Sequence, residues 1–157
     1  MTRFGYTLMT EQSGPKELVR YAVSAERVGF DFEVSSDHYF PWLSSQGHAP
    51  YAWSVLGAVA HATEQVELFT YVTCPTMRYH PAVVAQKAAT LQILADGRFT
   101  LGLGTQVKAH IERRFGLPWT AAGPWMREYV HAVRAVWDNW QNGTPLDVKG
   151  PHYNINL

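Results

Sequence analysis

Three residues that could do chemistry follow a short run of β-forming residues: Asp37, His38 and, four residues further on, Trp42. An imidazole titrates near neutral pH, so His38 could act as a general base that takes a proton from a hydroxyl group. Asp37 could orient that ring or bind a polar atom of a cofactor, and Trp42 could form a wall of a substrate pocket. The alternative is that Asp37 caps the loop, His38 is a surface histidine and Trp42 is a packing residue.

A second candidate group ends another β-type run, over residues 70–76. Small hydroxyls at the carboxyl end of a strand can meet a ligand, and the N-terminus of a following helix attracts an anion. The alternative is a strand exit in which prolines shape a turn. Cys74 is the one cysteine of the chain, and a lone thiol is more typical of a small buried apolar residue than of a nucleophile.

A third candidate group is the sequence Gly102-Leu103-Gly104-Thr105, which closes a further β-type run. It is not a dinucleotide-binding motif, because Val107 stands where the third glycine of G-x-G-x-x-G would be. Glycines at such a place favour the close approach of a flat ligand to the backbone. The six histidines other than His38 show no spacing typical of metal ligands, so we expect no metal site.

The elements that must position these groups form a repeat. β-type runs begin near residues 4, 30, 66 and 98, and a helical run follows each of the first three. These spacings match βαβ units, whose crossovers make neighbouring strands parallel. Four parallel strands are half of the eight that close a (β/α)8 barrel. We therefore expect an α/β fold that is half of a TIM barrel, completed by association; an open sheet, or part of a longer protein, are the other possibilities.

In the second and fourth strands of this repeat, the polar residues Asp31, Glu33, Arg98 and Thr100 alternate with apolar residues. A parallel strand covered by helices on both sides is expected to be apolar on both faces. The alternation therefore favours a barrel in which the polar residues face the lumen or its mouth.

The last third of the chain departs from the repeat. Its pattern predicts a short helix over 107–115, a long amphipathic helix over 126–141 and a small β-hairpin around Lys149-Gly150-Pro151. We expect a single domain over 1–157, with a four-strand half-barrel over 1–105 and a helical appendage over 106–157.

Composition narrows the class of protein. Thirteen basic and thirteen acidic residues give no net formal charge, which disfavours nucleic acid and acidic membranes as partners. No stretch approaches the roughly 18 apolar residues of a membrane span, and no leader pattern stands at the N-terminus. A single cysteine cannot form an internal disulfide, which favours a cytoplasmic setting.

Four separated stretches carry a resemblance to a known family: residues 36–42, 47–50, 73–86 and 97–105. They resemble the bacterial-luciferase-like superfamily and occur in its order. Over residues 3–105 the sequence is most similar to the F420-dependent (deazaflavin) oxidoreductases of the glucose-6-phosphate dehydrogenase-like branch, whereas residues 106–157 resemble another branch. The chain corresponds to about half of a full family member.

The resemblance implies a role for each candidate residue. His38 would be the base that takes the substrate's hydroxyl proton, Trp42 would line the pocket and stabilise the transition state, and Asp37 would hydrogen-bond the deazaflavin ring system. Thr105 would lie near the mouth of the cofactor site. The strand exit that carries a non-proline cis peptide behind the central ring would be Tyr71, Val72, Thr73 and Cys74.

The implied reaction is hydride transfer between a carbon of a small-molecule, alcohol-type substrate and C5 of coenzyme F420. The branch carries Gly-Thr-Gly-Glu after its fourth strand, and the glutamate acts as the acid partner. Here Gly104-Thr105-Gln106-Val107 stands in its place, so no carboxylate takes that role.

Three hypotheses follow from the sequence. The chain is the cofactor-facing half of an F420-dependent oxidoreductase, active once a homodimer or a complementary half-barrel completes it. Alternatively, it is a luciferase-like monooxygenase relative that holds FMN in the same pocket. The third hypothesis is a non-catalytic half-barrel, whether fragment, fusion or designed piece, that self-associates through open sheet edges.

Overall fold

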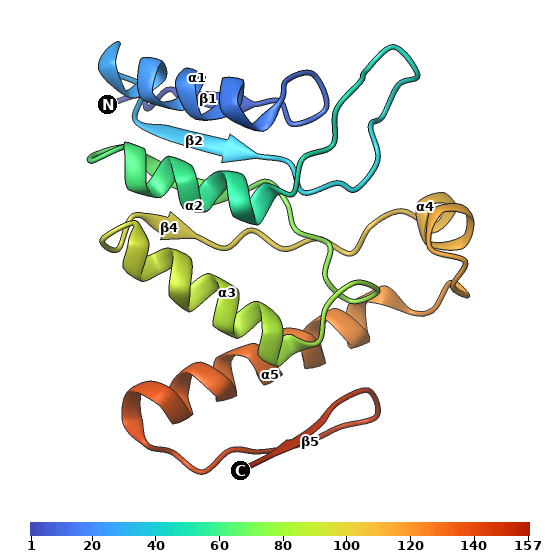
Figure 1. Cartoon of the computed structure of the whole chain (residues 1–157). Helices are drawn as coiled ribbons and strands as arrows, with labels where there is room; N and C mark the ends of the chain where they lie inside the picture. The colour runs from blue at the N-terminus through green and yellow to red at the C-terminus, as the bar shows by residue number, and fades with distance from the viewer. The chain divides into compact units, whose positions relative to one another are not determined.

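The computed structural model describes all 157 residues and shows two compact units. The first unit comprises residues 1–73 and 90–103, and the second comprises residues 74–89 and 104–157. The elements of Figure 1 are, in chain order, β1 (Gly5–Leu8), α1 (Pro15–Arg27), β2 (Phe32–Ser35), α2 (Ala52–Ala62), β3 (Glu67–Thr70), α3 (Pro81–Leu94), β4 (Phe99–Thr100), α4 (Lys108–Arg114), α5 (Ala122–Asn142), β5 (Asp147–Lys149) and β6 (Asn154–Asn156).

A four-stranded parallel sheet forms the centre of the first unit. The strands pair in the order β1-β2-β3-β4, and the crossovers between them contain α1, α2 and α3. The pairing is in direct register, so that Leu8, Ser35 and Thr70 lie side by side at the ends of the first three strands. This arrangement confirms the predicted α/β fold with four parallel strands.

The two faces of this sheet differ from the prediction for β2. Glu33 and Ser35 are fully buried, and Glu33 lies close to Glu26 of α1, which places the polar side chains on the helix-covered face. Phe32 and Val34, on the other face, are only half-buried. The prediction of a lumen-facing side chain is therefore wrong for Glu33, whereas Thr100 of β4, in register with Phe69 and Val34, is exposed on the other face. Ser35 is small enough for the helix-covered side, whereas Glu33 is a buried carboxyl group that lies near both Glu26 and Arg98.

Two charged side chains join α1, α2 and β4 at the amino ends of the strands. The guanidinium of Arg98 donates hydrogen bonds to the carbonyl oxygens of Ala60 and Val66, at 3.1 and 2.8 Å. The carboxylate of Glu26 accepts the backbone N–H groups of residues 64–66. Although partial burial opposes ionisation, these N–H groups keep the pKa of Glu26 below its ordinary value.

Glu33 lies in the same region without a hydrogen-bond partner. Its side chain is fully buried, and neither of its carboxylate oxygens is bonded. Burial, reinforced by the nearby carboxylate of Glu26, raises the pKa of Glu33 to about 7, while the charge of Arg98 acts in the opposite direction. The carboxyl group is therefore partly protonated at neutral pH.

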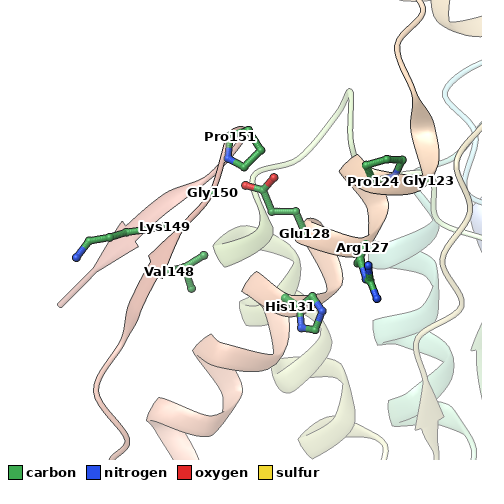
Figure 2. A pocket seen from close by; sticks show the side chains of 9 residues that line it. All are labelled: Gly123, Pro124, Arg127, Glu128, His131, Val148, Lys149, Gly150 and Pro151. Carbon is green, nitrogen blue, oxygen red and sulfur yellow. The ribbon is translucent and has the colours of Figure 1, made fainter.

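Aromatic residues hold the second unit together. The indole of Trp125 donates a 2.8 Å hydrogen bond to the hydroxyl of Tyr153, and its ring stacks on His152 with centroids 5.2 Å apart. The carboxylate of Glu128 accepts the backbone N–H groups of His152 and Tyr153, at 2.9 and 2.7 Å. These contacts hold the β5–β6 hairpin against α5. The hairpin lies where the sequence predicted it. An open groove of about 560 Å³ lies between the hairpin and α5 (Figure 2).

The first half of α3 packs on α5 within the same unit. Tyr129 is fully buried and donates to the carbonyl oxygen of Tyr79 at 3.1 Å, and Trp137 donates to that of Ala85 at 2.9 Å. Burial raises the pKa of Tyr129 far above its usual value, so its hydroxyl stays a donor.

Most of the predicted elements are present with small shifts at their ends, and α5 shows the largest. It begins at Ala122 rather than at Met126, because Pro124 lies in its first turn, where a helix does not need the missing N–H group. It ends at Asn142, and Gly143, with a φ of 67°, forms its left-handed C-cap. None of the helices combines the length and the apolar character needed to cross a bilayer.

The replacement Glu33→Gln tests the buried carboxyl group. Because its pKa is about 7 in the fold and 4.5 ordinarily, the folded state binds the extra proton, and the free energy of unfolding falls as pH rises from about 4.5 to 7. We expect this loss, at most about 3 kcal/mol, to be absent in the variant. Urea unfolding at pH 5 and pH 8 measures both proteins.

The matched control is Glu17→Gln, which changes an exposed carboxylate of α1 that pairs with Arg20. We expect this variant to keep the pH dependence of the original chain, with stability changed by less than about 1 kcal/mol. Equal pH dependence in the Glu33→Gln variant and the original chain would contradict the role assigned to Glu33.

Candidate active site

The carboxyl ends of β1, β2 and β3 bring the candidate residues together. Since parallel strands in register end at the same edge, the residues that follow each strand become neighbours. Residues 9–11 follow β1, residues 36–38 follow β2 and residues 71–73 follow β3. All of these belong to the first unit.

At this edge His38 pairs with a buried glutamate. Its Nδ1 lies 2.5 Å from Oε1 of Glu11, a residue 27 positions earlier in the chain. The side chain of Glu11 is 1% exposed and that of His38 is 16% exposed. His38 is therefore not an ordinary surface histidine but one half of a largely desolvated acid–imidazole pair.

Further hydrogen bonds fix Glu11. The hydroxyl of Ser36 donates to Oε2 of Glu11 at 3.0 Å and lies 2.7 Å from the hydroxyl of Thr10. The backbone N–H of His48 donates to the carbonyl oxygen of Glu11 at 3.2 Å. Both carboxylate oxygens of Glu11 thus have a donor, and the long loop after β2 is tied to the turn after β1.

The pairing decides which nitrogen of His38 can act as a base. An ionised carboxylate only accepts hydrogen bonds, so the proton of the neutral imidazole must sit on Nδ1, between the ring and Glu11. The lone pair then lies on Nε2. If Nε2 takes up a proton, the positive charge that forms is adjacent to the carboxylate, which stabilises it.

Trp42 contacts the same imidazole. The two rings meet edge to face with centroids 4.7 Å apart, and the side chain of Trp42 is 49% exposed. The side-chain oxygen of Gln46 accepts the backbone N–H groups of Trp42 and Leu43, at 2.9 and 3.0 Å. These two hydrogen bonds hold the loop in which the indole lies beside His38 and is half exposed, and its role as the wall of a substrate pocket stays a prediction.

Asp37 is buried and is held by two donors from different elements. Its Oδ2 accepts the indole N–H of Trp53, at the start of α2, at 3.1 Å. The same oxygen accepts the hydroxyl of Thr73 at 2.8 Å. The side chain of Thr73 is therefore directed at Asp37, which the sequence did not predict.

The strand exit at β3 has the expected backbone feature. The peptide bond between Tyr71 and Val72 is cis, as the resemblance implies, and the side chain of Tyr71 is 72% exposed. Gly102 lies alongside, and its N–H donates to Thr70 Oγ1 at 2.9 Å. A Cβ at Gly102 would collide with the carbonyl oxygen of Thr70. Contact between neighbouring strands therefore requires a glycine at this position, and the close approach of a ligand to these glycines stays a prediction.

The remaining two predicted residues, Cys74 and Thr105, belong to the second unit. Cys74 is buried, as expected of a lone thiol, and Thr105 is half-buried. Their contact with a cofactor stays a prediction.

Sequence reasoning missed Glu11. It lies in Thr10-Glu11-Gln12, which matches no motif, and its partner is distant in the sequence. The signal that could have found it is its position three residues after the first β-type run, where a parallel barrel presents functional groups.

The full chain, residues 1–157, matches the family model described as luciferase-like monooxygenase. The chain belongs to this family. That result confirms the resemblance drawn from the sequence motifs.

Curated relatives of this luciferase-like chain are named F420-dependent glucose-6-phosphate dehydrogenase. The protein from Beutenbergia cavernae is 43% identical over 154 residues, which cover 98% of this chain and 45% of the relative. The protein from Microbacterium testaceum is 41% identical, with 98% and 45% covered. The chain thus spans a little under half the length of these relatives, and the likeness continues through residues 106–157.

Among solved structures, an F420-dependent secondary alcohol dehydrogenase in complex with an F420-acetone adduct is similar over 99% of this chain and 47% of its own, with 33% identity and a TM-score of 0.84. The oxygenating constituent of 3,6-diketocamphane monooxygenase from Pseudomonas putida, in complex with FMN, shares the fold with a TM-score of 0.78 at 19% identity, over 99% of this chain and 43% of its own.

The tautomer of His38 is a direct test of the pair. We expect nitrogen-15 NMR of the neutral ring to show the proton on Nδ1 in the original chain and a shift toward Nε2–H in Glu11→Gln, because a neutral amide no longer fixes the donor. His131, an exposed histidine of α5, serves as the internal control and keeps its signals. An Nε2–H tautomer of His38 in the original chain would contradict the pairing.

Proposed function

We propose that this chain is the cofactor-facing half of an F420-dependent oxidoreductase that transfers hydride between an alcohol-type substrate and a deazaflavin. The observation that carries the proposal is the desolvated Glu11–His38 pair next to Asp37 and Trp42 at one strand-end edge. Relatives and a solved structure named as F420-dependent dehydrogenases support this cofactor.

The residues at this edge fit a flat redox ring. A heterocycle with ring N–H and carbonyl groups needs a fixed acceptor, and Asp37 is a buried carboxylate held by protein donors. It also needs a wall, and the exposed side of Tyr71 next to the cis bond can provide one. Coenzyme F420, when bound, supplies a carbon centre that accepts or returns a hydride.

The chain's own residues then handle the proton and the orientation. Nε2 of His38 takes the hydroxyl proton of the alcohol, and the carboxylate of Glu11 stabilises the imidazolium that results. Trp42 limits rotation of the imidazole and offers an apolar surface to the substrate. Asp37 holds the ring system so that the reacting atoms meet in a fixed geometry.

No carboxylate stands where the branch has its acid partner. The side-chain oxygen of Gln106 is bonded instead to the N–H of Val107 and lies 3.0 Å from Nδ1 of His110, at the start of α4. We therefore assign the proton chemistry to the Glu11–His38 pair alone.

The open sheet suggests where the other half of the site comes from. β1 and β4 each pair on one side only, so both edges present unpaired backbone groups. We propose that further parallel strands, from the same polypeptide or from a second copy, cover these edges and close the barrel.

Titration with coenzyme F420 and with FMN tests the proposed function. We expect binding of the oxidised deazaflavin, followed by its fluorescence, and weak binding of FMN. The reverse preference would favour the FMN-dependent monooxygenase alternative, and binding of neither would leave a non-catalytic half-barrel.

Replacement of His38 by Ala tests the base. We expect turnover with an alcohol and F420 to fall by about 100-fold or more, while the affinity for the deazaflavin changes little. Because the change leaves a buried oxygen of Glu11 without its donor, we also expect a loss of about 1–3 kcal/mol in stability, measured by urea unfolding. Unchanged turnover in a folded variant would remove the base assignment.

The mass in solution tests closure of the barrel. If a second copy covers the sheet edges, light scattering will show a dimer of the 17.7 kDa chain at micromolar concentration. A stable monomer without aggregation would contradict closure by a second copy.

A further inference from the structure

We infer that Trp53 and Thr73 are positioning residues that orient the carboxylate of Asp37 for the cofactor. The inference rests on the proposed function, in which Asp37 holds the deazaflavin. Nothing in the resemblance assigns a role to Trp53, and for Thr73 the structure shows a hydrogen bond to Asp37 in addition to the cofactor contact that the resemblance implies.

The geometry that supports this is the convergence of two donors on one oxygen. Both the indole N–H of Trp53 and the hydroxyl of Thr73 bond to Oδ2 of Asp37, at 3.1 and 2.8 Å. They approach from different elements, α2 and the segment after β3. A carboxylate held at one oxygen from two directions cannot rotate freely, so the direction of its other oxygen is set by the protein.

Each donor is itself fixed. The ring of Trp53 packs edge to face on Phe99 of β4, with centroids 5.8 Å apart. The backbone N–H of Thr73 donates to the carbonyl oxygen of Gly102 at 2.9 Å, and Thr73 forms a parallel bridge with Leu103. The sheet and α2 therefore determine where Asp37 points before any ligand arrives, which reduces the entropy lost on binding.

A merely structural role would be to satisfy a buried carboxylate. In that case, loss of one donor would lower stability but would not change cofactor affinity through Asp37. The two roles are separated by variants that remove a single hydrogen bond; Thr73→Val nearly keeps the side-chain volume, whereas Trp53→Phe also shortens a buried ring, so its unfolding free energy is measured alongside. Thr73→Val and Trp53→Phe remove a donor, whereas Thr73→Ser retains the hydroxyl.

Fluorescence titration with coenzyme F420 gives the first readout. We expect Thr73→Val and Trp53→Phe each to weaken binding by about five- to tenfold, and Thr73→Ser to stay within about twofold of the original chain. In an Asp37→Ala background, Thr73→Val should have no further effect, because no carboxylate remains to be oriented. Asp37→Asn provides a second background if the alanine variant does not fold.

The cofactor-free protein gives the second readout. We expect the indole N–H resonance of Trp53 to move in Asp37→Ala and in Thr73→Val but to stay in place in Thr73→Ser. The indole of Trp137, which donates to Ala85, is the internal control and should not move.

The outcomes separate this inference from the proposed function. If Asp37→Ala leaves F420 affinity unchanged, or the original chain binds no F420, the cofactor role of Asp37 fails and the inference fails with it. If Asp37→Ala weakens binding but Thr73→Val and Trp53→Phe do not, the inference alone is overturned. Full additivity of Thr73→Val with Asp37→Ala would likewise overturn it.

Discussion

The candidate site depends on the parallel, in-register pairing of β1, β2 and β3. Leu8, Ser35 and Thr70 end their strands side by side, so the three following turns share one edge. Glu11 then reaches His38, and Thr73 reaches Asp37, across 27 and 36 residues of sequence. A slip of one residue in either pairing would turn alternate side chains to the opposite face and separate both pairs.

The opposite edge of the same sheet uses charge for a different purpose. There Arg98 and Glu26 bind backbone groups that α2 and the following turn leave without partners. Glu33 lies among them without a hydrogen bond, and its burial there raises its pKa and disfavours the ionised form. At the carboxyl ends of the strands Glu11 and His38 are bonded to each other, whereas at the amino ends Arg98 and Glu26 bind backbone groups.

Local patterns in the sequence predicted much of the fold and part of the site. Alternation and helical spacing gave the four strands and their crossovers, and Asp37, His38 and Trp42 stood out because they follow a strand together. Glu11 was missed because its partner is distant in the sequence. The buried side of β2 was misjudged because side-chain alternation shows that two faces differ, but not which one the helices cover.

The loop between β2 and α2 contacts Glu11 at both of its ends. Ser36 binds the side chain of Glu11, and His48 binds its carbonyl oxygen twelve residues later. The residues between these anchors, including Phe40 and Leu43, form a loop whose two ends are held at Glu11. Replacements at its tip therefore leave the hydrogen bonds of Ser36 and His48 to Glu11 in place, so sequence change in this segment does not loosen the site's buried glutamate.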